Sequence, residues 1–88
     1  MSFKVQWSEG AIEDLKRLKD KELARKILAK VSDYVARDPV PLGKALTGQF
    51  AGLYRYRFGK IRVIYAVDIQ HRVLSILQVG NRKDVYRR

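Results

Sequence analysis

The amino-acid sequence predicts a single α+β domain in which a two-helix antiparallel hairpin packs on a mainly antiparallel four-stranded sheet. Three observations lead to this prediction: an alternating segment near the N-terminus, two stretches with helical spacing of apolar residues, and three alternating segments in the second half. Helices and strands that occur in separate runs are typical of α+β folds. The 88 residues fit one domain, residues 1–88, whose small core leaves no room for an enclosed chamber.

The first half is predicted to form one strand and two helices. Phe3–Trp7 alternates apolar and polar residues, as a strand with one buried face does. Ser8 and Asp20 are suited to cap the start of each helix, and the short break between the helices favours an antiparallel hairpin. Apolar residues line one face of each helix: Ala11, Ile12, Leu15 and Leu18 in the first, and Leu23, Ile27, Leu28, Val31, Tyr34 and Val35 in the second.

The second half is predicted to contain three strands, over residues 53–58, 61–67 and 73–79. Asp38-Pro39-Val40-Pro41 is expected to end the second helix because proline cannot continue it, and residues 42–52 are expected to form a loop. Gly59-Lys60 suits a type II′ hairpin turn. Gly80-Asn81 is expected to end the last strand, and the polar tail at 81–88 is expected to dock near the sheet.

The residue types that the chain lacks exclude several kinds of catalytic and binding site. With no cysteine, it has neither disulfides nor thiol catalysis, and no apolar run is long enough to span a membrane. The only histidine, His71, falls in a predicted surface turn, and the second half has only two acids, Asp68 and Asp84. These residues favour neither a magnesium site nor a His/Glu acid–base pair. We therefore expect a cytoplasmic protein with no cofactor, no metal and no membrane partner.

Positive charge is concentrated in the second half. Residues 1–43 carry nine Lys and Arg and seven Asp and Glu, whereas residues 44–88 carry ten and two. Solubility alone does not require such an asymmetry. A basic surface of this kind attracts a polyanion through counterion release, so nucleic acid is the expected partner.

The hairpin register predicts a cluster of arginines. A two-residue turn at Gly59-Lys60 would pair Arg57 with Arg62 and place Arg55 on the same face of the sheet. Like charges directly opposite each other are destabilising, and an anionic ligand would remove that penalty. Because arginine matches phosphate geometry, the cluster indicates a phosphate-binding patch; arginines that splay into solvent are the alternative.

The C-terminal segment extends this patch if it docks on the sheet. Arg82 and Tyr86 would then join Arg55, Arg57 and Arg62 as candidate catalytic residues, and further candidate RNA- or phosphate-binding residues are Lys44, Lys60, Lys83, Arg87 and Arg88. Arginines can stabilise the negative charge that develops on a phosphorane-like transition state, while the 2′-hydroxyl of RNA supplies the nucleophile. Neighbouring cations favour the phenolate of Tyr86, which makes it a candidate general base; an aromatic plug on the sheet edge is its alternative role.

Three segments in order resemble the RelE toxins of bacterial and archaeal toxin–antitoxin systems: Leu46-Thr47-Gly48, residues 53–65, and residues 79–86. The resemblance implies a toxin that enters the ribosomal A site and cleaves mRNA there by 2′-hydroxyl attack, and that is neutralised by a RelB-like antitoxin. It also implies that the family's basic sheet residues fall on Arg55, Arg57 and Arg62, its late arginine on Arg82 and its tyrosine on Tyr86.

One departure and two alternatives accompany this resemblance. Well-known members have lysine where this chain has Arg55 and Arg57, and arginine is a poor proton donor, so these positions are expected to bind phosphate and stabilise charge. The first alternative is a ParE-type toxin, which poisons DNA gyrase and lacks the set formed by Arg62, Arg82 and Tyr86. The second alternative is a non-catalytic RNA-binding module.

Overall fold

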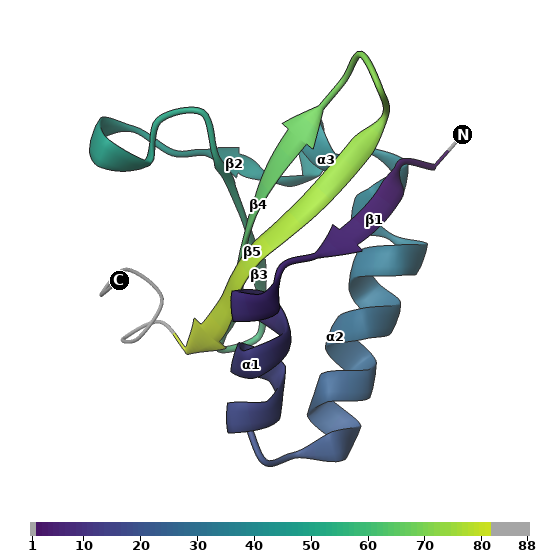
Figure 1. Cartoon of the computed structure of the whole chain (residues 1–88), viewed down its shortest axis with the longest axis vertical. Coiled ribbons are helices and arrows are strands. Elements are labelled where there is room, and N and C mark those ends of the chain that lie inside the picture. Colours follow the sequence, from purple (N-terminus) through teal and green to yellow (C-terminus); the bar gives the residue numbers. More distant parts are fainter. Residues whose placement is uncertain (1, 82–88) are drawn as a thin grey trace.

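The computed structural model describes residues 2–81 and consists of a five-stranded sheet with helices on one face (Figure 1). Its elements, in chain order, are β1 (Lys4–Trp7), α1 (Glu9–Arg17), α2 (Lys21–Asp33), α3 (Pro39–Leu42), β2 (Lys44–Ala45), β3 (Tyr54–Phe58), β4 (Ile61–Asp68) and β5 (Val73–Asn81). Short 3₁₀ turns occur at Val35–Arg37 and Gly48–Phe50. The strand order is β1-β5-β4-β3-β2; β1 pairs with β5 in parallel, and all other pairs are antiparallel.

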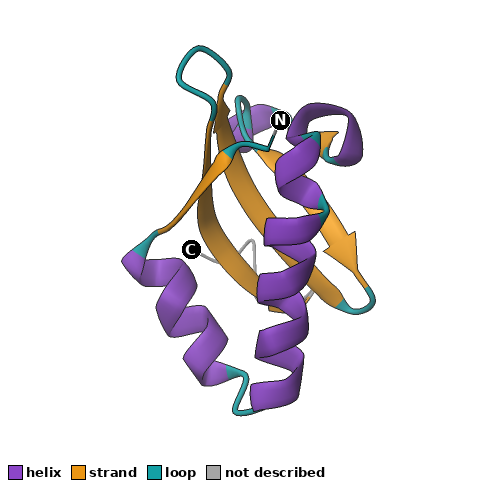
Figure 2. Ribbon diagram, turned by 90° about the vertical axis from the view of Figure 1, so that its right-hand side faces the viewer, coloured by secondary structure: helices purple, strands orange, loops and turns teal. Residues whose placement is uncertain are grey.

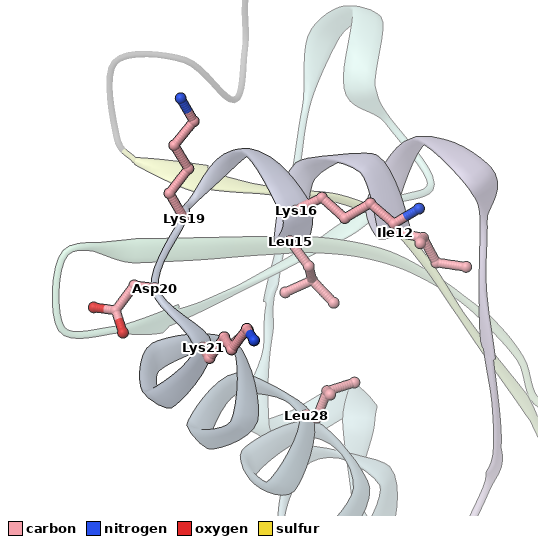
Figure 3. Close-up of a pocket in the computed structure, with 8 residues that line it drawn as sticks. Ile12, Leu15, Lys16, Lys19, Asp20, Lys21 and Leu28 are labelled. Carbon is pink, nitrogen blue, oxygen red and sulfur yellow. The ribbon is translucent and has the colours of Figure 1, made fainter.

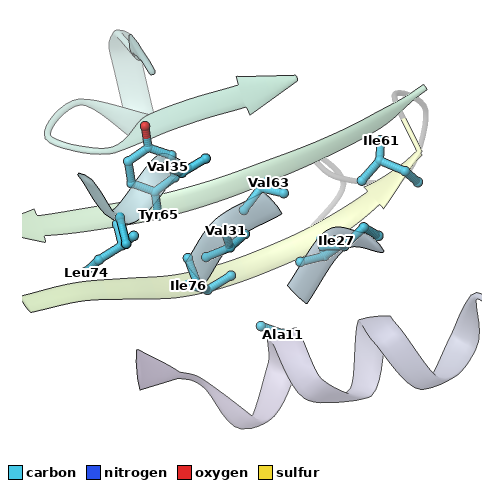
Figure 4. Close-up of a cluster of buried hydrophobic side chains, with 11 residues drawn as sticks. Ala11, Ile27, Val31, Val35, Ile61, Val63, Tyr65, Leu74 and Ile76 are labelled. Atoms are coloured by element: carbon cyan, nitrogen blue, oxygen red, sulfur yellow. The ribbon is translucent and has the colours of Figure 1, made fainter. Parts of the chain in front are cut away.

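The core lies between the sheet and the helices. α2 runs across one face of the sheet, and α1 lies alongside β5 (Figure 2). Ile27 and Val31 of α2 pack against alternate residues of the sheet, among them Val63, Tyr65 and Ile76, and all five are almost completely buried (Figure 4). The predicted α+β class, the helical hairpin and the mainly antiparallel sheet are therefore confirmed.

Both predicted helix caps are present. The Ser8 hydroxyl accepts a hydrogen bond from the backbone N–H of Ala11 at 3.0 Å, and the Asp20 carboxylate accepts one from Leu23 at 3.0 Å. Lys19 between the helices has φ +53°, the left-handed conformation that lets the chain reverse within a short connection. These local features explain why α1 and α2 form a hairpin.

Several predicted boundaries were wrong. The segment 42–52 is not simply a loop, because Lys44–Ala45 pairs with β3 and adds a fifth strand to the predicted four. The second helix ends at Asp33, and Pro39 begins the helical turn α3, since proline suits the first position of a helix. Gly80 and Asn81 continue β5 because they still pair with Arg62 and Ile61 of β4. The predicted docking of the tail concerns residues 82–88, which lie outside the described residues.

A buried tyrosine ties the α3–β2 segment to the sheet. The Tyr65 hydroxyl donates a 2.6 Å hydrogen bond to the carbonyl of Pro39, and burial raises the Tyr65 pKa well above its usual range. The phenol therefore stays protonated as a donor. A Cβ atom at Gly43 would collide with the Tyr65 hydroxyl oxygen, so only glycine fits beside this bond. This contact fixes where β2 begins.

Candidate functional site

The predicted arginine register is confirmed. Phe58 pairs with Ile61, and Arg57 lies directly opposite Arg62. Gly59 has φ +60°, and Lys60 is not among the residues with positive φ, which fits the type II′ turn rather than type I′. Lys60 is exposed in that turn.

Four basic residues share the sheet face that points away from α2. Lys44 lies opposite Arg55, and Arg57 opposite Arg62, so alternation along the strands sends all four side chains to the same side. We call this set, Lys44, Arg55, Arg57 and Arg62, the arginine face. The position of Lys44 depends on β2, which the sequence did not reveal.

Exposure differs across the arginine face. Lys44 and Arg57 are exposed and Arg55 is half-buried, whereas Arg62 is only 7% exposed. Gly80 of β5 lies opposite Arg62. Ile64, on the same face, is also buried. The face thus has a nearly buried arginine, Arg62, at its centre and exposed cations, Lys44 and Arg57, at its margin, where phosphate oxygens could bind.

No carboxylate of the described chain pairs with Arg55 or Arg57. The side chain of Asp68, at the far end of β4, accepts hydrogen bonds from the backbone N–H and ring Nδ1 of His71, at 3.0 and 2.9 Å. The backbone bond from His71 and then the side-chain bond lower the Asp68 pKa. The predicted surface position of His71 is confirmed. The positive charge of these two arginines is therefore available to an anion from outside.

Gln78 adds a polar group that sequence reasoning missed. It lies opposite Ile64 in β5, on the same side of the sheet as the arginine face, and its buried Oε1 atom has no hydrogen-bond partner among residues 2–81. A buried acceptor without a donor costs free energy, so its presence calls for an explanation. Gln78 could have been found from the sequence because it occupies an alternating position in a strand next to the arginine face.

Sequence reasoning also missed Asp14. Its carboxylate stabilises β5, the strand that precedes Arg82 in the chain. Its carboxylate is buried, accepts a 2.9 Å hydrogen bond from the backbone N–H of Val79, and pairs with Arg17 at 3.4 Å. β1 ends opposite Ile76, so α1 takes over the edge of β5 beyond that point. The spacing of Asp14 from Ala11, on the buried stripe of α1, was the sequence signal.

The remaining predicted site residues lie outside the described residues: Arg82, Lys83, Tyr86, Arg87 and Arg88. Among residues 2–81, no group of three or more His, Asp or Glu side chains is arranged to hold a metal ion. Within the same range, no helix is long and apolar enough to cross a membrane.

Comparison with known proteins identifies the family. The profile of the ParE toxin of the type II toxin–antitoxin system parDE matches residues 5–86. This chain is a toxin of the RelE/ParE superfamily. It is 34% identical to toxin RelG of Mycobacterium tuberculosis over 100% of both chains, and 35% identical to toxin RelE of the same organism over 97% of this chain and 87% of the other.

Solved structures agree with this membership. The toxin–antitoxin complex RelBE2 from M. tuberculosis contains a chain that superposes with a TM-score of 0.87 at 27% identity, covering 93% of this toxin and 100% of that chain. The predicted resemblance to RelE toxins is therefore confirmed. Because a ParE profile and two Rel toxins match the same residues, superfamily membership alone does not select between the activities of the two groups.

Proposed function

We propose that this toxin is a metal-independent endoribonuclease that cleaves mRNA in the ribosomal A site and so inhibits translation. The observation that carries the proposal is the arginine face, in which the nearly buried Arg62 lies opposite the exposed Arg57, beside the half-buried Arg55 and the exposed Lys44. Guanidinium groups match phosphate oxygens in geometry and charge. Such a face suits the backbone of a single RNA strand better than an uncharged ligand.

In the proposed reaction the RNA 2′-oxygen forms a bond to the adjacent phosphorus while the bond from phosphorus to the 5′-oxygen breaks. The products are a 2′,3′-cyclic phosphate and a new 5′-hydroxyl. Tyr86 accepts the 2′-hydroxyl proton, water gives a proton to the leaving 5′-oxygen, and Arg62 and Arg82 stabilise the charge on the phosphoryl oxygens. Arg55 and Arg57 hold the flanking phosphates, together with Lys44, Lys60, Lys83, Arg87 and Arg88.

The partners in this proposal are the ribosome with its mRNA and a RelB-like antitoxin, all in the cytoplasm. The toxin–antitoxin complex RelBE2 supports the antitoxin partner by analogy. An antitoxin restrains the toxin until it is released. The basic arginine face supports an RNA partner.

The experiment is to incubate the purified toxin with an mRNA, free and on programmed ribosomes, with and without EDTA, and to map any cut at nucleotide resolution. Cleavage within the A-site codon, on ribosomes only and unaffected by EDTA, supports the proposal. The absence of cleavage in every case, with the toxin shown to be folded, contradicts it.

A second candidate function is inhibition of DNA gyrase, favoured by the ParE profile that matches residues 5–86. Under this alternative the toxin blocks supercoiling of a relaxed plasmid by purified gyrase and leaves ribosome-bound mRNA intact. The two assays, run on one preparation, separate the candidates.

Tyr86→Phe tests the proposed base. We expect it to lower the cleavage rate far more than ribosome affinity, because it removes a proton acceptor and keeps the ring. Single-turnover cleavage and ribosome binding are measured on the same variant. Equal losses in rate and affinity would show that Tyr86 serves binding rather than proton transfer.

A further inference from the structure

Aromatic side chains gather where the end of α2 meets β3. The rings of Tyr34, the residue that caps the C-terminus of α2, and Tyr56 of β3 lie 6.0 Å apart between their centroids and are tilted by 59°. The Lys30 ammonium lies 4.9 Å from the centroid of the Tyr34 ring and 5.7 Å from that of the Phe58 ring. We call these four residues, Lys30, Tyr34, Tyr56 and Phe58, the aromatic edge.

Tyr34 is more exposed than its place in the sequence pattern predicts. Helical spacing placed Ile12, Leu28 and Tyr34 on the core-facing sides of the two helices, but they are 41%, 40% and 44% exposed, so that detail of the prediction was wrong. Ile12 and Leu28 are turned away from the sheet because they line the groove between α1 and α2 (Figure 3). Tyr34 and Lys30 lie on the other flank of α2, against the rings of β3.

The aromatic edge borders a part of the sheet that no further strand of the described chain covers. β2 pairs with β3 only at Tyr54 and Arg55, so the outer side of residues 56–58 has no strand partner among residues 2–81. Arg57, in the middle of this stretch, is exposed and points to the opposite side of the sheet, within the arginine face. A ligand that bends around this edge therefore meets both surfaces.

The surroundings of the aromatic edge are basic. Lys26 is exposed one helical turn before Lys30, on the same flank of α2, and Lys60 is exposed in the turn that follows Phe58. No acid of the described residues forms an ion pair with Lys30. Cations beside exposed aromatic rings are the combination that single-stranded nucleic acids require, because bases stack on the rings while the cations contact phosphates.

We propose that the aromatic edge binds one nucleotide of single-stranded RNA, with its base stacked on the exposed ring of Tyr34 and its phosphate at Lys30. The inference rests on the proposed function for the nature of the partner. It adds a second contact, away from the phosphodiester that reacts, which holds a flanking nucleotide. RNA held there and bent around β3 brings a neighbouring phosphate to Arg57.

Other roles fit the aromatic edge less well. Burial, and then the neighbouring Tyr34, raise the pKa of Tyr56, which makes this phenol a poor proton acceptor and disfavours a catalytic role. Packing of α2 on the sheet alone would bury Tyr34, as it buries Val31 one turn earlier. A second copy of this toxin would bring a formal charge of +10 against the same cations.

The test uses a fluorescein-labelled 2′-O-methyl RNA of about six nucleotides, whose binding to the full toxin is followed by fluorescence anisotropy. The methyl group blocks the nucleophile, so the probe reports binding without cleavage. We expect a dissociation constant of about 1–100 μM at low salt. Tyr34→Leu keeps an apolar side chain and removes the ring, and it should weaken binding by about 5- to 100-fold. Tyr34→Phe should change binding less than about twofold.

Two further measurements separate stacking from charge and from folding. An abasic backbone of the same length and charge should bind wild type at least about fivefold more weakly than the complete probe, and it should bind Tyr34→Leu as it binds wild type. Lys30→Gln should lower the slope of log K against log salt by about 0.7, whereas Tyr34→Leu should leave that slope unchanged. The control for Lys30 is Lys21→Gln, an exposed lysine on the other flank of α2.

The matched control for the ring is His71→Leu, because His71 is an exposed aromatic side chain in the β4–β5 turn and should not affect the probe. Equal losses in Tyr34→Leu and His71→Leu would overturn the proposal, as would an equal effect of Tyr34→Leu on the complete and abasic probes. Binding of the complete probe to wild type weaker than about 1 mM would also overturn it. Thermal unfolding, monitored by circular dichroism, confirms that each variant is folded.

Failure of the proposed function remains distinguishable. In cleavage on ribosomes, Tyr34→Leu should raise the toxin concentration needed for half-maximal rate and leave the saturating single-turnover rate unchanged. If wild type does not cleave mRNA but Tyr34→Leu loses base-dependent binding of the inert probe, the aromatic edge stands and the ribonuclease proposal falls. If wild type cleaves mRNA but Tyr34→Leu binds and cleaves as wild type does, the aromatic edge falls and the proposed function stands.

Discussion

The two faces of the sheet are built from neighbouring residues of the same strands but have different environments. On β4, Val63 and Tyr65 point into the core beneath α2, whereas Arg62 and Ile64 point to the opposite side. The first face buries uncharged side chains against helices. The second gathers cations around a recessed arginine. Alternation along one strand thus separates the residues that hold the fold from those that meet a ligand.

This separation predicts that a substitution changes either stability or activity, depending on the face of the sheet that carries it. Substitutions on the helix-covered face should change stability and leave activity per folded molecule intact. Substitutions of the exposed members of the arginine face, Lys44 and Arg57, should change activity and leave stability nearly intact, because repulsion between like charges contributes nothing favourable to folding. Pairs of adjacent residues on one strand provide the sharpest comparison.

The largest expected effect is that of Arg62→Ala on cleavage. By analogy with the removal of one donor to a developing oxyanion, we expect a loss of about 2.7–4 kcal/mol of transition-state stabilisation, or about 100- to 1,000-fold in rate. Single-turnover cleavage on ribosomes measures it. The matched variant is Val63→Ala, which should cost about 2 kcal/mol of unfolding free energy and little activity. Near-normal cleavage by Arg62→Ala would remove this residue from the site.

The hairpin that creates the arginine face could be predicted because its determinants are local. A glycine at the first turn position fixes the turn type, and the turn type fixes which residues pair. The opposition of Arg57 and Arg62 follows from the turn at Gly59 alone. The caps at Ser8 and Asp20 were predictable for the same reason.

Long-range contacts explain what could not be predicted. β2 is only two residues long, and it is held by pairing with β3 and by the contact between Gly43 and Tyr65, far apart in sequence. Asp14 is buried because β1 is shorter than β5 and a backbone N–H of Val79 needs an acceptor. Neither partner can be identified from the residue's own neighbours in the chain.

The next largest effect is expected at Gly43, on the helix-covered side. Gly43→Ala should lower the unfolding free energy by about 1–3 kcal/mol, since its Cβ would collide with the buried Tyr65 hydroxyl. Gly10→Ala, in α1, is the control: its added Cβ would meet only Leu77 and Ser8, at ordinary van der Waals distances, and it should stabilise by up to about 1 kcal/mol. Urea unfolding measures both, and the same sign for the two variants would contradict the packing argument.

Gln78→Ala tests whether the arginine face extends to β5. If the buried Oε1 accepts a hydrogen bond from RNA, its loss should weaken RNA affinity by about 0.5–1.5 kcal/mol, up to roughly tenfold. Stability should hold or rise, because the variant removes a buried acceptor that has no donor in the described part of the chain. Ser75→Ala, farther along the same face, is the control for RNA binding. Reduced stability with unchanged affinity would assign Gln78 to the fold instead.

The smallest effect is expected at Asp68, the acid at the far end of β4 from Arg62. Hydrogen bonds from His71 hold the Asp68 pKa below its unfolded value of about 3.9, so the carboxylate contributes stability above that pH. The contribution is lost as the pH falls through the lowered pKa of the folded state. Asp68→Asn should therefore be slightly less stable than wild type near neutral pH, and the difference should vanish in acid.

Urea midpoints from pH 7 down to about 2.5 test this, with Glu13→Gln as the exposed-acid control. Cleavage should be unchanged in Asp68→Asn because its carboxylate is engaged with His71 and not with the arginine face; a change in cleavage would show that the two ends of the strand are coupled.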